Sequence, residues 1–282
     1  MILGFLGKGG SGKSSVATQI ALYLHSEKEM KVLAIDADHN MDLSYNLFNG
    51  EIPSDVKYFG SSLKEITRYL GLSDDEKYDR VFQAEIPKRF SLSLMDDITK
   101  GFCFNRDDGM KVMIAGPQTD TVLYGQSCSH SLTTPLKIYL PLLELGENEY
   151  VVVDEKAGAD GVSTGIVTGI DVGIIVCEPA LHSIKTAKQI AKLMDFYQTP
   201  YVFVGNKIQS QEDIDFIIDT LGEEPIACLP DFPGVKRNPG SIIPQWSSEV
   251  MKVLAKAQEV NNNNRLNRTM EKFRRNREFE NK

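Results

Sequence analysis

Cysteine is scarce in this sequence of 282 residues, and its few cysteines are widely spaced. The four are Cys103, Cys128, Cys177 and Cys228, and no two of them have the C-x-x-C spacing. Chains that depend on disulfides are usually short, secreted and dense in cysteine. The spacing therefore argues against a disulfide framework and predicts a protein of the reducing cytoplasm.

Long apolar runs are also missing. No run approaches the roughly 18 to 20 residues that are needed to cross a bilayer. The first apolar stretch, residues 2–6, is too short for a signal peptide and has no basic leader. We therefore expect neither a membrane span nor a secretion signal, which agrees with a cytoplasmic location.

Basic charge is in deficit. Lys and Arg number 31 against 39 Asp and Glu, so the formal net charge is −8. Proteins that grip nucleic acid do so through clustered Lys and Arg, so this balance argues against a nucleic-acid partner. The exception is the segment 261–282, which has seven basic and three acidic residues and thus a charge of +4.

Short β-branched or apolar runs alternate with amphipathic segments of helix length. Apolar strands that alternate with helices are typical of a parallel sheet covered on both faces. The pattern therefore predicts an α/β fold with a doubly wound, mostly parallel sheet. We expect strands at 2–6, 31–35, 111–115, 150–153, 172–177, 201–204 and 226–229, and helices at 13–25, 131–145, 183–196 and 212–221.

Two segments do not follow this alternation. Residues 41–110 are mixed and polar, which indicates an insertion of helices and loops after the second strand. Residues 261–282 begin with four asparagines and continue as a basic segment. We expect a single domain over 1–260, followed by a basic C-terminal helix or tail.

A glycine-rich loop separates the first predicted strand from the first predicted helix. Its glycines let backbone N–H groups close around phosphate oxygens, and the helix N-terminus that follows favours negative charge. The pattern G-x-x-x-x-G-K-[ST] places a lysine on the β- and γ-phosphates and a hydroxyl on Mg²⁺. Here the loop is Gly7-Lys8-Gly9-Gly10-Ser11-Gly12-Lys13-Ser14, and Ser15 completes the residues that we expect to bind nucleotide.

A second lysine, Lys8, makes the loop more specific. The string K-G-G-x-G-K-[ST] over residues 8–14 resembles the deviant phosphate loop of the ParA/MinD/nitrogenase-iron-protein group of ATPases. In that group the early lysine reaches the nucleotide of the partner subunit, so the resemblance implies an ATP-dependent homodimer. Together with Lys13, such a lysine would neutralise charge that develops during phosphoryl transfer.

Acidic residues close two other predicted strands. Asp36 and Asp38 end the second strand, at the edge where α/β sheets bind ligands. In the group that the loop resembles, the second acid orients the attacking water and the first lies near Mg²⁺, which implies these roles for Asp38 and Asp36. Asp154 resembles a Walker B acid, which implies a contact with Mg²⁺ beside Ser14.

The later part of the chain resembles the same group around the rest of the nucleotide. Gly158, in the pattern D-x-x-A-G, matches a flexible switch whose backbone N–H meets the γ-phosphate. Asn206 stands where the group recognises adenine through a side-chain amide, and Lys207 follows it. Pro230 and Asp231 follow the last predicted strand, as in the group's base-stacking loop. We therefore expect ATP and Mg²⁺ as cofactors and ATP hydrolysis as the activity.

One stretch is similar to the ATPases that insert nickel into carbon monoxide dehydrogenase. Members carry Cys-x-Cys before an interface helix, and the two subunits hold one metal ion between these pairs. Here the second position is a histidine, in Cys128-Ser129-His130. Cys128 and His130 from two subunits would form a Cys₂His₂ site acceptable to Zn²⁺ or Ni²⁺, and the client would be a metalloenzyme. An alternative is a helix-start cysteine beside a capping or exposed histidine.

Two other functions remain open. One is a MinD/ParA-type positioning ATPase on a membrane or nucleoid, for which the basic tail would supply an amphipathic helix with Leu266, Met270 and Phe273 on one face. Such a weak apolar stripe favours a solvated or docked helix instead. The other is a nucleotide-gated docking module without metal cargo.

Overall fold

The computed structural model describes residues 1–72, 81–82, 88–117, 132–159, 162, 166–234 and 238–280. Its strands are β1 (Ile2–Gly7), β2 (Lys31–Asp36), β3 (Phe90–Ser91), β4 (Phe104–Asn105), β5 (Lys111–Ile114), β6 (Leu143–Glu144), β7 (Glu149–Asp154), β8 (Val172–Cys177), β9 (Tyr201–Ile208) and β10 (Ala227–Pro230). Its α-helices are α1 (Lys13–Leu22), α2 (Asp42–Leu47), α3 (Leu63–Tyr69), α4 (Asp97–Phe102), α6 (Thr134–Leu142), α8 (Leu181–Tyr197), α9 (Gln211–Leu221), α11 (Ser247–Val260) and α12 (Arg265–Glu280). Shorter turns are η1 (Tyr23–Glu27), η2 (Phe59–Ser61), η5 (Ile166–Gly169) and η6 (Pro244–Trp246).

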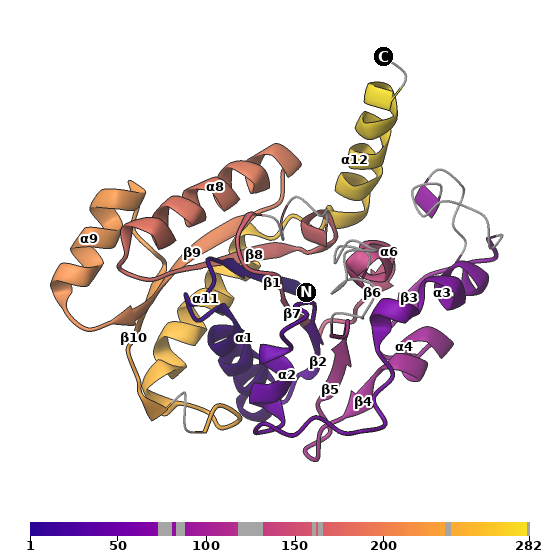
Figure 1. Cartoon of the computed structure of the whole chain (residues 1–282), viewed down its shortest axis with the longest axis horizontal. Helices are drawn as coiled ribbons and strands as arrows, with labels where there is room; N and C mark the ends of the chain where they lie inside the picture. Colours follow the sequence, from indigo (N-terminus) through magenta and orange to yellow (C-terminus); the bar gives the residue numbers. More distant parts are fainter. Residues whose placement is uncertain are drawn as a thin grey trace.

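A single large sheet organises the part of the chain that the structure describes (Figure 1). Eight strands follow the order β10-β9-β8-β1-β7-β2-β5-β4, and only β4 runs antiparallel to its neighbour. The predicted doubly wound, mostly parallel α/β fold is therefore confirmed. Because β1 lies between β7 and β8, the loop that follows it emerges at the middle of the sheet's carboxyl edge.

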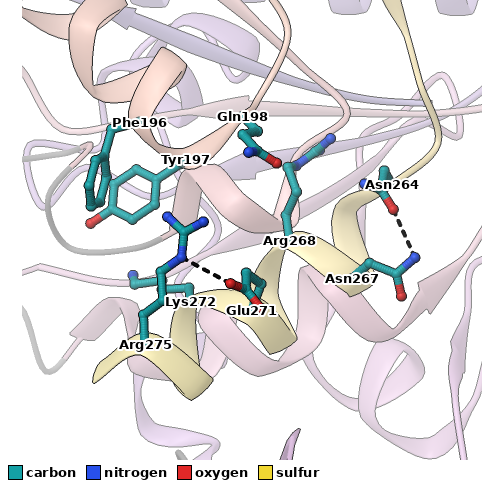
Figure 2. A pocket seen from close by; sticks show the side chains of 9 residues that line it. All are labelled: Phe196, Tyr197, Gln198, Asn264, Asn267, Arg268, Glu271, Lys272 and Arg275. Atoms are coloured by element: carbon teal, nitrogen blue, oxygen red, sulfur yellow. Dashed lines mark hydrogen bonds and ion pairs between the residues drawn. The ribbon is translucent and has the colours of Figure 1, made fainter. Parts of the chain in front are cut away.

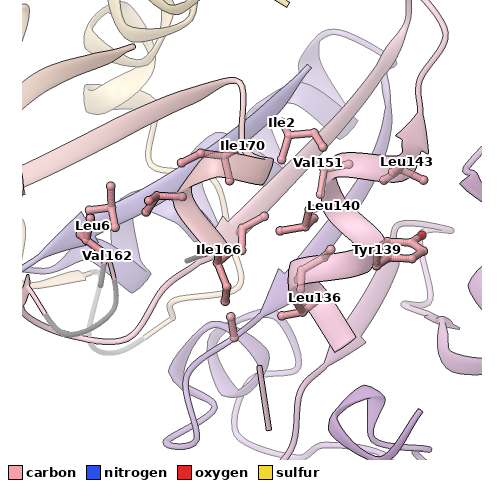
Figure 3. Packing of buried hydrophobic residues seen from close by; sticks show 14 of the residues in the cluster. Ile2, Leu6, Leu136, Tyr139, Leu140, Leu143, Val151, Val162, Ile166 and Ile170 are labelled. Atoms are coloured by element: carbon pink, nitrogen blue, oxygen red, sulfur yellow. The ribbon is translucent and has the colours of Figure 1, made fainter. Parts of the chain in front are cut away.

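Helices cover both faces of the sheet, as the alternation of side chains along the strands requires. Ile2 and Leu6 of β1 belong to the core cluster that includes residues of α6, α8 and η5 (Figure 3). Leu3 and Phe5 point the other way, into the cluster that includes residues of α1 and α11. The side chains of β1 in both clusters are fully buried, so this central strand supplies a rigid base for the loop at its end.

Several boundaries differ from the sequence prediction. The first helix ends at Leu22 and continues as one π-helical turn, η1. The helix expected over 131–145 ends at Leu142, and the next two residues form β6, which pairs with β3. The segment 41–110 contains strands β3 and β4 as well as the expected helices and loops.

The basic tail forms α12, and its first half packs against η5 and α6. Arg265 pairs with buried Asp171 at 3.0 Å, and the hydroxyl of Thr269 donates to that of Thr168 at 3.0 Å. Phe273 is 5% exposed and stacks on Phe82 with ring centroids 5.1 Å apart. The placement of a domain boundary at residue 260 stays a prediction. Within the described ranges, no helix has both the length and the apolar character to cross a membrane.

Candidate nucleotide-binding site

The phosphate loop runs from the end of β1 to the start of α1. Gly10 and Gly12 have φ angles of 84° and 88°, a left-handed conformation that favours glycine. A Cβ atom on Gly12 would lie 2.2 Å from the amide nitrogen of Asn206. That amide donates to the carbonyl oxygen of Ser11 at 2.9 Å, so β9 supports the loop from the side. The loop therefore requires glycine for both its turn and its close packing.

Lys13 lies between two acids. Its Nζ is 3.3 Å from Asp38 Oδ2 and 3.3 Å from Asp154 Oδ1, and it is 3.5 Å from Ser14 Oγ. Burial opposes the charged ammonium, but the negative charges of Asp154 and Asp38 outweigh it and raise the pKa of Lys13. Lys13 is thus a buried cation at the helix N-terminus, where phosphate oxygens can replace carboxylates as partners.

Asp36 is fully buried at the end of β2 and is tied to the start of α2. Its Oδ2 accepts hydrogen bonds from the backbone N–H and the hydroxyl of Ser44, each at 2.8 Å. Burial and the nearby charge of Asp154 raise the pKa of Asp36 to about 8, although these hydrogen bonds oppose the shift. Asp36 therefore fixes the segment between β2 and α2, which also carries Asp38.

Asp38 faces both Lys13 and the neighbouring histidine. Its Oδ1 accepts from the backbone N–H of Asn40 at 3.2 Å and lies 3.4 Å from His39 Nδ1. The side chain is almost completely buried, yet it is anchored to a loop rather than to a strand. This position suits a group that must meet the substrate after a small movement of the loop.

Asp154 ends β7 and keeps one oxygen without a partner. Ser14 and Lys13 hydrogen-bond to this carboxyl group, but burial raises its pKa overall. Its Oδ2 has no hydrogen-bond partner although it is buried. A buried oxygen beside a serine hydroxyl fits a magnesium ion, which usually takes one or two protein ligands and completes its shell with phosphate and water. The described residues contain no group of three or more His, Cys, Asp or Glu arranged to hold a metal by themselves.

Glu155 is a member of this site that the sequence patterns did not single out. It is 1% exposed, its Oε1 has no hydrogen-bond partner, and burial, followed by the charge of Asp154, raises its pKa to about 8. The sequence carries no motif for it beyond its place next to Asp154. Its membership of the site is seen only in the folded structure, where its carboxyl group is buried close enough to Asp154 and Asp38 for their charges to act on it.

Gly158 folds back onto the phosphate loop. Its backbone N–H donates to the carbonyl oxygen of Gly7 at 2.8 Å, and its φ is 83°. Ala157 lies beside Gly9, because a Cβ on that glycine would be 3.7 Å from the Cβ of Ala157. Contact between the Gly158 N–H and a γ-phosphate would therefore require the bond to Gly7 to open.

Lys207, next to Asn206 on β9, also contacts the phosphate loop. Its Nζ donates to the carbonyl oxygen of Gly10 and pairs with Glu178 at 2.6 Å. Its φ of 60° is unusual for a residue other than glycine, which indicates that these contacts fix the backbone. From the sequence we expect Lys207 to bind nucleotide. In this structure its ammonium group contacts the backbone of the phosphate loop, and a direct contact with nucleotide stays a prediction.

The remaining predicted residues lie around the same edge. Lys8 is half-buried, and its Nζ reaches only the carbonyl oxygen of Gly9, at 3.4 Å, among the contacts described. Asp231 accepts from the side chain of Gln209 at 3.2 Å, and the carbonyl of Pro230 accepts from Trp246 at 3.0 Å. Cys128 and His130 lie outside the described residues.

Comparison with known proteins agrees with this geometry. The family described as "CobQ/CobB/MinD/ParA nucleotide binding domain" matches residues 3–276. The carbon monoxide dehydrogenase accessory protein CooC of Rhodospirillum rubrum is 30% identical over 225 residues, which are 78% of this chain and 79% of that protein. An uncharacterized ATP-binding protein of Methanocaldococcus jannaschii is 29% identical over 233 residues, 82% of this chain and 88% of that protein.

Solved structures share the fold. A ParA family ATPase from Chlorobium tepidum TLS has a TM-score of 0.56 at 20% identity, and the match covers 95% of both chains. MinD from Pyrococcus horikoshii in complex with Mg-ADP has a TM-score of 0.60 at 17% identity, covering 93% of this chain and 95% of that one.

Proposed function

The chain belongs to the CobQ/CobB/MinD/ParA nucleotide-binding family, and from this premise we propose that it is an ATP-hydrolysing, dimeric switch that serves nickel insertion into a metalloenzyme. The observation that carries the ATPase part is the buried set of Lys13, Asp38 and Asp154 behind the phosphate loop. In this set the ammonium group of Lys13, expected to bind phosphate, lies within hydrogen-bonding distance of two carboxylates. Asp38 is on a loop, and Asp154 is at the end of a strand.

In the proposed mechanism, water attacks the γ-phosphate in line with the bond that breaks. Asp38 orients the water, while Lys13 neutralises charge on the transferred group. Ser14 and Asp154 would hold Mg²⁺, which supplies further neutralisation of the phosphate oxygens, and Asp36 keeps the Asp38 loop in place. Because water is activated by position rather than by a strong base, the geometry of Asp38 controls the rate.

Dimerisation is the second part of the proposal. Lys8 is half-buried at the rim of the loop, and in the described ranges its Nζ makes only a long hydrogen bond, 3.4 Å, to the carbonyl oxygen of Gly9, so its side chain can turn toward a partner subunit. ATP between two subunits would draw the Gly158 N–H from Gly7 to the γ-phosphate. Hydrolysis would then reverse both movements and reset the dimer.

The nickel branch of the proposal rests on the similarity to CooC and on Cys128 and His130. A Cys₂His₂ site between subunits would change shape whenever the nucleotide changes the interface. Metal release to the client enzyme would thereby be coupled to the ATP cycle.

The positioning alternative would use α12 as a membrane anchor. In this structure Phe273 stacks on Phe82 and Leu266 packs against the same core, which leaves Met270 as the exposed member of the stripe. Lipid binding would need buried Phe273 and partly buried Leu266 to leave this core. ATP-dependent sedimentation with liposomes would favour this alternative, and its failure would argue against it.

The first test is the substitution Asp38→Ala. We expect ATP hydrolysis to fall at least about 100-fold, since one positioned catalytic group contributes that order of magnitude, while an ATP-bound dimer accumulates. Hydrolysis assays and light scattering after size-exclusion chromatography measure both effects. Asp55→Ala, at an exposed carboxylate, is the matched control. A variant that stays monomeric with ATP while the unchanged protein dimerises would contradict the role of Asp38.

The second test addresses the metal. The purified ATP-bound dimer is titrated with Ni²⁺ and Zn²⁺, and we expect one ion per dimer. Cys128→Ala should abolish this binding, whereas Cys103→Ala, a cysteine packed against the core, should leave it unchanged. Equal stoichiometry in the Cys128→Ala variant would rule out the site and leave the ATPase assignment intact.

A further inference from the structure

A pocket of about 280 Å³ lies between the C-terminal end of α8 and the first turns of α12 (Figure 2). Helix α8 starts next to the nucleotide-binding edge of the sheet and has 17 residues, so this end lies about 25 Å from that edge. The pocket, named here the α8–α12 pocket, is therefore separate from the nucleotide site. It is lined by Phe196, Tyr197, Gln198, Asn264, Asn267, Arg268, Glu271, Lys272 and Arg275.

Positive charge in the pocket is only partly compensated. Glu271 is the acid among the lining residues, and it is occupied by Arg274 at 2.7 Å and Arg275 at 3.0 Å. Lys272 and Arg268 form no ion pair with any carboxylate in the described ranges. Burial, together with the like charge of Lys137, lowers the pKa of Lys272 to about 8. An ammonium group in such surroundings is stabilised when an anion binds next to it.

Arg268 adds a buried donor that has no acceptor. The residue is 4% exposed, and its two terminal nitrogens donate to Asn262 and to the carbonyl oxygen of Ile170. Its Nε–H is buried and has no hydrogen-bond partner. Buried donors of a charged group are seldom left unpaired in native proteins. The Nε–H is enclosed by protein, so Arg268 contributes the positive charge of its guanidinium at the base of the pocket, and this charge favours an anion there.

One wall of the pocket is aromatic. Phe196 is 59% exposed, an unusual state for a large apolar ring, and Tyr197 supports it edge-on with centroids 5.1 Å apart. Lys272 lies over the Tyr197 ring at 5.1 Å. The guanidinium carbon of Arg275 lies over one side of the Phe196 ring, 6.0 Å from its centroid, so the wall combines an exposed aromatic ring with two cations held beside the rings.

We propose that the α8–α12 pocket binds a small phosphate monoester, whose phosphate lies between Lys272 and Arg268 and whose aromatic group packs on Phe196. Neither cation forms an ion pair within the described part of the chain, although the nearby Asp171 carboxylate offsets part of the charge of Arg268. Two such cations match a dianion better than a monoanion, and a phosphate monoester carries about −1.5 to −2 charges at neutral pH. The amides of Gln198, Asn264 and Asn267 complete the rim and can bind hydroxyl groups of the ligand.

The test is calorimetric titration of the full chain, saturated with Mg-ADP so that the nucleotide site is filled. Phenyl phosphate is the probe, and inorganic phosphate and benzoate are compared with it. We expect one saturable site per chain, with phenyl phosphate bound more tightly than either comparison ligand. Lys272→Gln should weaken binding at least 10-fold and Phe196→Ala about 3- to 10-fold, the size of one aromatic contact. Lys192→Gln, an exposed lysine on α8, should have no effect.

Two results would overturn the proposal: the absence of saturable phenyl phosphate binding to the Mg-ADP-saturated protein, or equal affinity of the Lys272→Gln variant for phenyl phosphate. Equal affinity for benzoate would overturn the preference for a dianion. Lys272→Gln should fold normally because Lys272 has no hydrogen bond or ion pair in the described ranges, and circular dichroism checks this. Because ADP binding at the phosphate loop is measured separately, failure here is distinguishable from failure of the ATPase proposal.

Discussion

Four buried carboxyl groups share the floor of the nucleotide site with Lys13: Asp36, Asp38, Asp154 and Glu155. Burial raises the pKa of Asp36 and of Glu155 to about 8, so the protein lowers its internal repulsion by retaining protons. This is a costly arrangement for stability, and it is typical of sites that function through charge.

Glu155→Gln should therefore stabilise the protein, and more so at alkaline pH. The folded protein holds the Glu155 proton more tightly than the unfolded chain does, because its pKa rises from 4.5 to about 8. Its contribution to the free energy of unfolding is complete below pH 4.5 and is lost as the pH rises toward 8. The glutamine side chain is neutral at every pH in this range, so the variant does not lose this stability at alkaline pH. We expect little difference at pH 5 and a gain of about 1 to 3 kcal/mol near pH 9.

Thermal unfolding of both proteins between pH 5 and pH 9 measures this gain. Glu147→Gln removes the charge of an exposed side chain and should show no such trend. A difference between Glu155→Gln and the unchanged protein that is constant with pH would contradict the buried-proton interpretation.

At the scale of elements, the parallel strands of the central sheet could be predicted from sequence, whereas the antiparallel edge strand β4 was not predicted and the later helices were predicted only in part. β8 has the expected bounds, because its apolar run is continuous and is buried on both faces. Helix α11 was not predicted, although Val250, Val253, Leu254 and Ala257 have the spacing of a buried helical face. This apolar spacing can be read from the sequence and would have predicted the helix. The contact of Lys207 with the phosphate loop could not be predicted from the sequence, because it depends on the left-handed backbone at that residue.

The docking of α12 gives a prediction at this scale. Phe273→Ala should reduce the free energy of unfolding by about 3 kcal/mol, since a buried aromatic ring and its stack on Phe82 are lost. Urea unfolding followed by circular dichroism measures the change. The matched control is Met270→Ala on the same helix, whose side chain is 45% exposed, and it should change stability by less than about 0.5 kcal/mol. Equal effects of the two substitutions would show that α12 is not docked through Phe273.

At the scale of the whole molecule, nucleotide and metal should stabilise the protein together. One Lys13 faces several acids, so phosphate without a cation would add negative charge to a site that already repels it. We expect Mg-ADP at 100 times its Kd to add about 2.7 kcal/mol to the free energy of unfolding. ADP with EDTA should add much less. Thermal unfolding measures both, and Lys13→Ala should remove the response. An equal shift with EDTA would contradict a role for Mg²⁺.

The central position of β1 has a consequence for how the chain folds during synthesis. β1 leaves the ribosome before its two neighbours in the sheet, β7 and β8. The loop after β1 contacts Asp154 through Lys13 and Asn206 through Ser11, and these partners lie 141 and 195 positions later in the chain. At about 5 to 20 residues per second, roughly 7 to 40 s pass before these partners are synthesised. Until then an apolar strand waits unpaired, so a nascent chain of this topology needs protection from aggregation, and it acquires its nucleotide loop only late in its own synthesis.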